Sequence, residues 1–155
     1  MRGWTVTAIE VDVPQTLSVS EDPSVRYPAT DIVWWEDPPG DRRAQVARVM
    51  EAAAREAVAD LDGPEPVTMR LRVNRFHALT PVALASGRRG WHDVNFDVAI
   101  VARDGRVLAE ERGVNADLRA LQGAQAEAAR QGGETQAARI RRRVAAVLRG
   151  WLGLA

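Results

Sequence analysis

The sequence predicts an α+β fold in which a mostly antiparallel sheet carries two main helices on one face, in the order β-β-α-β-β-β-α. Two patterns predict this class. Residues 66–74 and 91–102 alternate apolar and polar side chains, as half-buried strands do. Residues 42–61 and 135–154 instead repeat apolar side chains at helical spacing. With 155 residues, the chain is long enough to form a single domain, residues 1–155, around a sizeable core.

The first strand is predicted over residues 4–13. Its alternation changes phase near Ala8, which indicates a bulge or a strand that is apolar on both faces. Residues 14–31 are rich in proline, serine and aspartate, so we expect a long irregular connection. A short strand over residues 31–35 follows, and the prolines that begin at Pro38 end it.

The helix over residues 42–61 is the clearest element of the first half. Asp41 is its expected N-cap, and Asp62-Gly63-Pro64 ends it. The strand over residues 66–74 comes next, and residues 78–90 form a loop rich in small side chains.

The second half contains two more strands and the last helix. The strand over residues 91–102 is joined to its partner, residues 107–115, by the turn Arg-Asp-Gly-Arg, residues 103–106. Residues 116–133 are polar and only weakly helical. The helix over residues 135–154 then buries an apolar stripe.

Trp34 and Trp35 are adjacent, so a strand must point them to opposite faces. One indole is expected in the core, where it covers on the order of 200 Å². The other is either exposed to a partner or covered by the connection over residues 14–31. Together with Arg42 and Arg43, the tryptophans form the predicted partner-binding surface.

Composition excludes several classes of site. The 21 basic residues, all arginine, balance the 21 acidic residues, so no overall charge favours nucleic acid or an anionic membrane. The chain has no cysteine, which excludes disulfides, thiolate metal sites and cysteine nucleophiles. No apolar run approaches the roughly 20 residues that span a bilayer. The first residues lack a signal peptide, although a chain whose leader has been removed would look the same.

The two histidines, His77 and His92, lie beside aromatic residues, where packing or surface roles are more common than catalysis. A metal site of His92, Asp93 and Asp97 is disfavoured because strand alternation points the histidine away from both acids. No G-x-S-x-G nucleophile motif is present. We therefore predict no catalytic, cofactor-binding or metal-binding residues, and no cofactor.

Two arginine-rich runs and an acidic cluster also have structural interpretations. Residues 139–143, RIRRR, indicate a solvated helix face, with partner contact as the alternative. Residues 86–90, SGRRG, lack the strand–loop–helix context of a phosphate loop. Capping and turn formation explain the four acids near the tryptophans better than acid–base chemistry does. These acids are Asp31, Glu36, Asp37 and Asp41.

Several segments together resemble a family of small alphaproteobacterial proteins of unknown function, which generally carry a leader and are often described as lipoproteins. These segments are VSEDPSVRYPATDIVWWEDPPGDRRAQV, RFHALTP, GRRGWHDVNFDVAIV, VNADL and ETQAARIRRRVAAVL. The resemblance extends from about residue 5 to residue 152. It implies an exported protein of the cell envelope, or periplasm, with a lipidated cysteine ahead of the printed residues. This chain lacks both the leader and the cysteine, and a true start at Met1 would argue against export. The element order is also similar to that of the auxiliary lipoproteins of transport systems.

The expected function is a non-enzymatic envelope module that binds another protein, as an accessory subunit of a larger assembly. A homo-oligomer formed through a sheet edge is a further possibility, and any membrane contact would be through the lipid anchor. The alternative is a small-ligand or lipid-binding protein with a pocket between the sheet and the helices. Such a pocket would be lined by Trp4, Phe76, Phe96 or Trp151.

Overall fold

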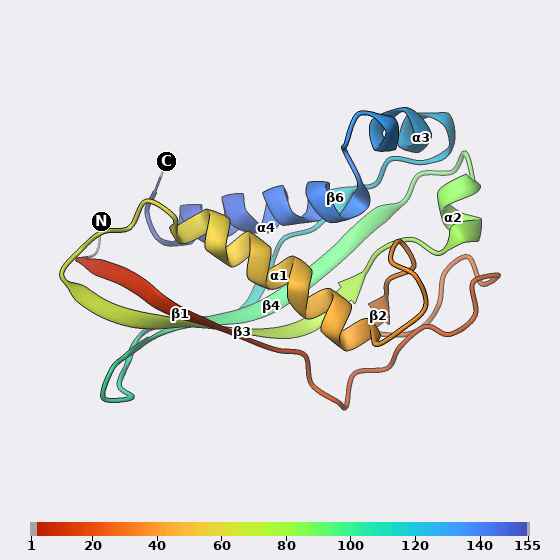
Figure 1. The fold of residues 1–155 in the computed structure, drawn as a ribbon. Coiled ribbons are helices and arrows are strands. Elements are labelled where there is room, and N and C mark those ends of the chain that lie inside the picture. Colours follow the sequence, from red (N-terminus) through yellow and green to blue (C-terminus); the bar gives the residue numbers. More distant parts are fainter. Residues whose placement is uncertain (1–2, 155) are drawn as a thin grey trace.

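The computed structural model describes residues 3–154 (Figure 1), and the expectation about a start at Met1 lies outside them. It confirms the predicted class, an α+β fold with a mixed, mostly antiparallel sheet. The elements follow in the order β1 (Trp4–Asp12), β2 (Ile32–Val33), α1 (Arg42–Val58), β3 (Glu65–His77), α2 (Pro81–Ala85), β4 (Trp91–Ala102), β5 (Val107–Asn115), β6 (Leu118–Arg119), α3 (Gly123–Gln131) and α4 (Gln136–Trp151).

The sheet has the strand order β1-β3-β4-β5, with β2 beside β3 and β6 beside β4. β1 and β3 are parallel because α1 returns the chain between them, whereas β3, β4 and β5 are antiparallel to their neighbours. β2 pairs with the last residues of β3, where Val33 lies opposite His77. β1 and β2 therefore lie along the same edge of β3, one at each end.

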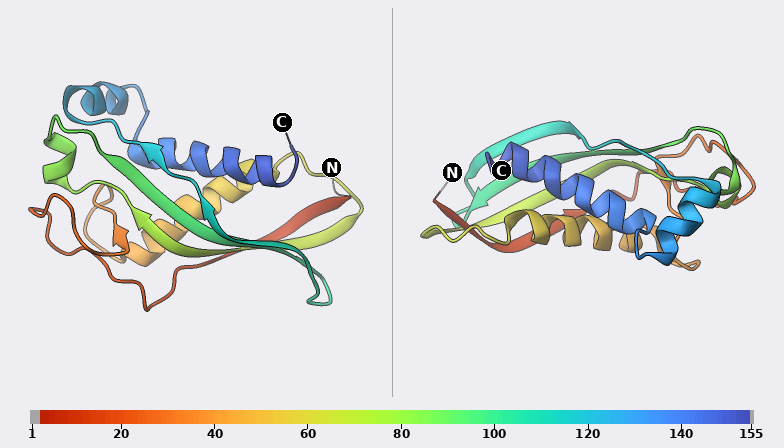
Figure 2. Two further views of the ribbon diagram at one scale, coloured as in Figure 1. Left: turned by 180° about the vertical axis from the view of Figure 1, so that it is seen from behind. Right: turned by 90° about the horizontal axis from the view of Figure 1, so that it is seen from above.

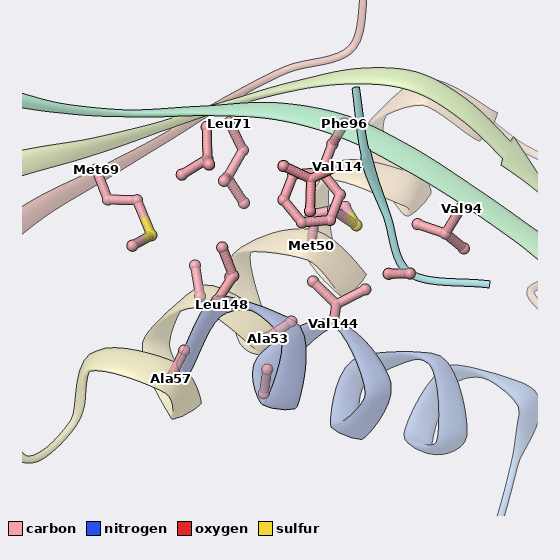
Figure 3. Packing of buried hydrophobic residues seen from close by; sticks show 14 of the residues in the cluster. Met50, Ala53, Ala57, Met69, Leu71, Val94, Phe96, Val114, Val144 and Leu148 are labelled. Atoms are coloured by element: carbon pink, nitrogen blue, oxygen red, sulfur yellow. The ribbon is translucent and has the colours of Figure 1, made fainter. Parts of the chain in front are cut away.

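Helices α1 and α4 lie side by side on one face of the sheet, as predicted (Figures 1 and 2). The inward-facing side chains of β3 and β4 are almost fully buried against the apolar stripes of these helices. Figure 3 shows this packing between the sheet residues Met69, Leu71, Val94, Phe96 and Val114 and the helix residues Met50, Ala53, Ala57, Val144 and Leu148. The main core thus lies between the sheet and the helix pair, and a small second cluster of Leu79, Ala83 and Ala120 lies apart from it.

The outer face of the sheet carries charged side chains. Arg70 Nε lies 2.8 Å from Glu10 Oε1, and Arg72 Nε lies 4.0 Å from Asp12 Oδ2. These side chains are more than half exposed, so each pair contributes little to stability. The pairs nevertheless keep the uncovered face polar.

The molecule has two distinct ends along the sheet. Near the chain termini lies the β4–β5 turn, while α2, β2 and the connection over residues 13–31 lie at the opposite end (Figures 1 and 2). We call this opposite end the distal end. Within the described residues, no helix combines the length and the apolar composition that crossing a bilayer requires.

Most predicted strand boundaries are confirmed to within a few residues, and β4 and β5 have the predicted ends. The bulge in β1 lies between Val6 and Ala8, slightly before its predicted place. In the β4–β5 turn, Gly105 has the expected positive φ, 93°. The first helix ends at Val58 rather than at residue 61.

Three short elements were not predicted as such. α2 lies in the segment expected to be a loop, where Thr80 caps it and Pro81 occupies its first turn. α3 is a nine-residue helix without buried side chains, so it has no apolar stripe to reveal it. β6 has two residues, too few for any alternation to show.

Candidate partner-binding site

Trp34 and Trp35 directly follow β2, and their side chains lie in different environments. Trp34 is the core residue, with 1% of its surface exposed. Its ring meets Phe76 edge to face, with the centroids 5.4 Å apart. Its Nε1 donates a hydrogen bond of 2.7 Å to Asp37 Oδ2, so the polar atom of this buried indole is satisfied.

Trp35 is half-buried at the surface. Its Nε1 donates to Ser20 Oγ at 3.2 Å, and the Arg42 guanidinium lies 4.8 Å from its ring centroid. This cation–π contact covers one side of the indole. The connection over residues 14–31 therefore touches Trp35 through Ser20 but leaves part of the ring accessible.

Arg42, in the first turn of α1, is buried and holds the preceding turn together. Its Nη1 donates to Asp37 O at 3.0 Å, to Pro38 O at 3.2 Å and to Gln45 Oε1 at 2.8 Å. Burial is tolerated because these acceptors surround the guanidinium. Arg42 is thus fixed where it stacks on Trp35.

Arg43 fastens the long connection to α1. Its Nη2 donates to Leu17 O at 2.6 Å and to Gln15 O at 3.1 Å, and its Nε donates to Pro14 O at 3.3 Å. One planar guanidinium with several donors can bind three carbonyls of one loop in this way. Arg43 is half-buried, so part of it also reaches the surface.

A pocket of about 330 Å³ opens beside Trp35, and we call it the Trp35 pocket. It has an aromatic wall, two guanidinium groups and the Glu21 carboxylate at its border. Its lining residues are Val19, Ser20, Glu21, Trp35, Pro39, Gly40, Asp41, Arg42 and Arg43. The structure thus brings together three of the four residues of the predicted surface, while Trp34 belongs to the core. Whether the surface binds a partner stays a prediction, and that partner would contact mainly Trp35 and Arg43.

The four acids near the tryptophans have the structural roles expected of them. Asp41 caps α1 by accepting from Ala44 N at 3.1 Å, and Asp31 accepts from Ser18 N at 2.9 Å. Asp37 accepts from Trp34. Glu36 caps a helix about one hundred residues later in the chain, accepting from Gln136 N at 2.8 Å and from Ala137 N at 2.9 Å.

The arginines of the RIRRR run are mostly engaged with the protein itself. Arg142 pairs with Glu134, and Arg141 Nε lies 3.8 Å from Glu56 Oε1. The other two donate to carbonyls of the β6 region, Arg139 to Arg119 O at 2.9 Å and Arg143 to Asp117 O at 3.1 Å. The run therefore joins α4 to its neighbours.

The two histidines occupy different environments. His77 Nε2 lies 2.8 Å from Pro28 O and ties the long connection to β3. His92 is completely buried, and neither ring nitrogen has a hydrogen-bond partner among the described residues. Burial, and after it the charge of Arg139, lowers the pKa of His92 to about 4. His92 therefore behaves as a neutral core residue at pH 7.

Strand alternation places His92 on the buried face of β4 and Asp93 and Asp97 on the other face, as predicted. Within residues 3–154, no three histidine, aspartate or glutamate side chains are grouped closely enough to hold a metal ion.

The carboxyl pair of Asp93 and Asp117 was not foreseen. Desolvation, and after it the Asp93 carboxyl, raises the pKa of Asp117. Asp117 Oδ1 accepts from Val94 N at 2.8 Å, and its own N donates to Asn115 Oδ1 at 2.8 Å. This last bond is an Asx turn, which the Asn-Ala-Asp sequence could have indicated.

Of the four residues named for a ligand pocket, two are packed into the core and two line a pocket. Phe76 and Phe96 are fully buried in the core. Trp4 and Trp151 do line a pocket, of about 240 Å³, near the chain termini. A second pocket of about 280 Å³ lies between α2, α3 and the start of α4, and a charged recess of about 510 Å³ lies on the outer face of the sheet.

Comparisons with known proteins give a family but no activity. No curated protein matches the chain. A candidate lipoprotein from Caulobacter crescentus CB15 is similar in structure, with 19% identity, a TM-score of 0.40 and coverage of 94% of this chain and 90% of that one. A protein from Xanthomonas campestris, of the family DUF330, has 13% identity, a TM-score of 0.48 and coverage of 97% and 82%. The profile of DUF6778, a family of unknown function, matches residues 4–155, and this chain belongs to that family.

Proposed function

We propose that this protein is a non-enzymatic interaction module of the cell envelope, an accessory subunit of a larger assembly that binds its partner at the Trp35 pocket. The observation that carries the proposal is the half-buried Trp35 stacked on Arg42 beside a pocket of about 330 Å³. Tryptophan and arginine are enriched among the residues that dominate binding energies at protein interfaces.

The pocket is also held rigid before any partner arrives. Arg42 is fixed by three acceptors, and Arg43 holds the loop that carries Ser20 and Glu21. A preorganised surface binds with a smaller loss of conformational entropy. The envelope location rests on the sequence resemblance and forms part of the proposal.

Site-specific photocrosslinking in cells tests the partner. A photoreactive amino acid replaces Glu21 at the border of the pocket, or Arg103 in the β4–β5 turn as the matched control. We expect one recurrent protein crosslinked from position 21 and not from position 103. Trp35→Ala should abolish that crosslink.

Two results would contradict the interaction role. One is the absence of a recurrent crosslink from position 21, and the other is a crosslink that Trp35→Ala leaves unchanged. A crosslink between two copies of this chain would make the partner a second copy. Mass spectrometry of the cellular protein's N-terminus tests the location separately, because a processed or lipidated terminus is expected for an envelope protein.

Small-ligand or lipid binding is the second candidate, and the pocket between Trp4 and Trp151 favours it. At about 240 Å³ this pocket lies below the roughly 300–1,000 Å³ of most ligand sites. A fluorescent fatty acid tests it directly. Saturable binding that Ala109→Trp removes would support this role, and the absence of such binding would eliminate it.

A further inference from the structure

Among residues 3–154, five large hydrophobic side chains are exposed, and four of them lie at the distal end. Tyr27 is 60% exposed, Trp91 59%, Val25 40% and Val82 38%. They come from three separate segments, namely the connection over residues 13–31, helix α2 and the first residue of β4. We call these four residues, with Arg88, Arg89 and Arg119, the distal surface.

Pairing at the end of β3 brings these segments together. His77, the last residue of β3, contacts Pro28 O, which is next to Tyr27. His77 also lies opposite Asp93 of β4, so Trp91 extends β4 beyond the end of β3. The different views agree that the long connection, α2 and the start of β4 share this end (Figures 1 and 2).

Three arginines lie near Trp91 in the sheet or in the chain. Arg119 is its partner in the β4–β6 ladder, so both side chains lie on the same face of the sheet. Arg88 and Arg89 lie in the exposed loop before it, separated from Trp91 by Gly90. None of these three arginine side chains makes an ion pair with another residue in the described part of the chain.

Four acids in these and adjoining segments have contacts of their own, which are ion pairs for Asp93 and Glu127 and backbone hydrogen bonds for the other two. Asp93 Oδ2 lies 3.2 Å from Arg75 Nε, and Glu127 pairs with Arg130. Asp22 accepts from Ser24 N at 2.9 Å, and Asp117 accepts from Val94 N. The distal surface therefore combines three arginines that make no ion pair within the described residues with exposed aromatic and aliphatic side chains.

We propose that the distal surface binds the headgroup region of an anionic lipid bilayer. Tryptophan and tyrosine favour the level of the lipid headgroups because their rings are apolar with one polar atom. Arginine guanidinium groups pair with lipid phosphates. The four apolar residues line none of the pockets described above. The four side chains come from separate segments at one end of the molecule. Such an arrangement suits insertion into a flat lipid interface better than binding of a peptide.

Binding of the purified protein to lipid vesicles tests this proposal without any partner protein. The vesicles are phosphatidylcholine alone, or phosphatidylcholine with phosphatidylglycerol as the anionic lipid. We expect binding only to the anionic vesicles, and weaker binding at high salt. The paired substitution Arg88→Ser and Arg89→Ser should weaken it roughly 30-fold, from the effect of about 1 kcal/mol per arginine near an anionic surface.

Trp91 provides a second readout. Lipids with brominated acyl chains quench tryptophan fluorescence at short range, so bound wild-type protein should lose emission that Trp91→Phe does not lose. Val107→Ser and Arg103→Ser are the matched controls, because both residues are exposed at the β4–β5 turn, away from the distal end. They should bind vesicles as the wild type does.

Equal vesicle binding by the wild type and the paired arginine variant would overturn the proposal, as would an absence of binding to anionic vesicles. A protein crosslink that depends on Trp91, without vesicle binding, would assign the distal surface to a protein partner instead. Near-ultraviolet circular dichroism confirms that each variant is folded. The result is independent of the Trp35 pocket, since Trp35→Ala should leave vesicle binding unchanged.

Discussion

Acid should destabilise this protein through His92. The side chain is completely buried on the inner face of β4, and neither ring nitrogen has a partner within the described residues. Burial, followed by the nearby Arg139, lowers the pKa of His92 to about 4. In the unfolded chain the same ring should titrate near the ordinary value of about 6.5.

The size of the effect follows from these two pKa values. As pH falls below about 6.5, the unfolded chain binds a proton that the folded protein does not, so stability decreases until pH reaches about 4. Between pH 7 and pH 5 this linkage removes about 2 kcal/mol, and the full shift is equivalent to about 3 kcal/mol. Above pH 7 the contribution of His92 is constant.

Urea unfolding at pH 7, 6 and 5, followed by circular dichroism, measures this loss. The wild type should lose about 2 kcal/mol more between pH 7 and pH 5 than His92→Leu does. Leucine leaves no polar atom in the same place, and the carboxylates titrate equally in both proteins. Because His77 is the only other histidine, His77→Gln measures how much that ring adds to the change of unfolding free energy with pH.

If the unfolding free energies of the wild type and of His92→Leu changed equally between pH 7 and pH 5, this reasoning would be refuted. That outcome would mean that the folded protein stabilises the protonated His92 ring, through a hydrogen bond or a water molecule beyond the contacts described above. Following the His92 ring by nuclear magnetic resonance separates these cases, because a folded-state pKa near 6.5 would show a solvated ring.

Three further predictions concern stability. Glu36→Gln should lower the free energy of unfolding by about 1 kcal/mol in urea titrations, because the carboxylate that caps α4 loses its charge. Gly63→Ala should lower the free energy of unfolding by about 1–3 kcal/mol, since its Cβ would lie 2.1 Å from the carbonyl carbon of Gly3. The control Gly87→Ala has open space around its Cβ and should leave the free energy of unfolding unchanged. Arg43→Ala should accelerate amide hydrogen exchange in residues 15–17 without changing exchange in β3 and β4. Unchanged exchange in residues 15–17 would show that other contacts hold the loop.

The sequence alone predicted the elements whose signals are local. β3, β4 and the two main helices were found because the side-chain period of a strand or helix follows from the backbone geometry of consecutive residues. The cap at Asp41 and the turn at Gly105 were predicted for the same reason, since the interacting groups are a few residues apart. The short helix α2 was missed and the polar α3 was only weakly indicated, because so few of their side chains are buried.

The candidate site was only partly accessible from the sequence. Strand alternation showed that Trp34 and Trp35 face opposite ways, but either could have been the core residue. The tertiary structure decides it, because Phe76 of β3 packs against Trp34, whereas Ser20 of the loop and Arg42 of α1 contact Trp35.

Contacts between distant segments were decided by the tertiary structure alone. Glu36 caps a helix one hundred residues away, and Trp91 meets Arg119 only because β6 pairs with the start of β4. No local pattern encodes such pairs, since they depend on how whole elements pack and on where the connecting loops close. The sequence therefore determined which segments form strands and helices, and packing determined which surfaces those segments share.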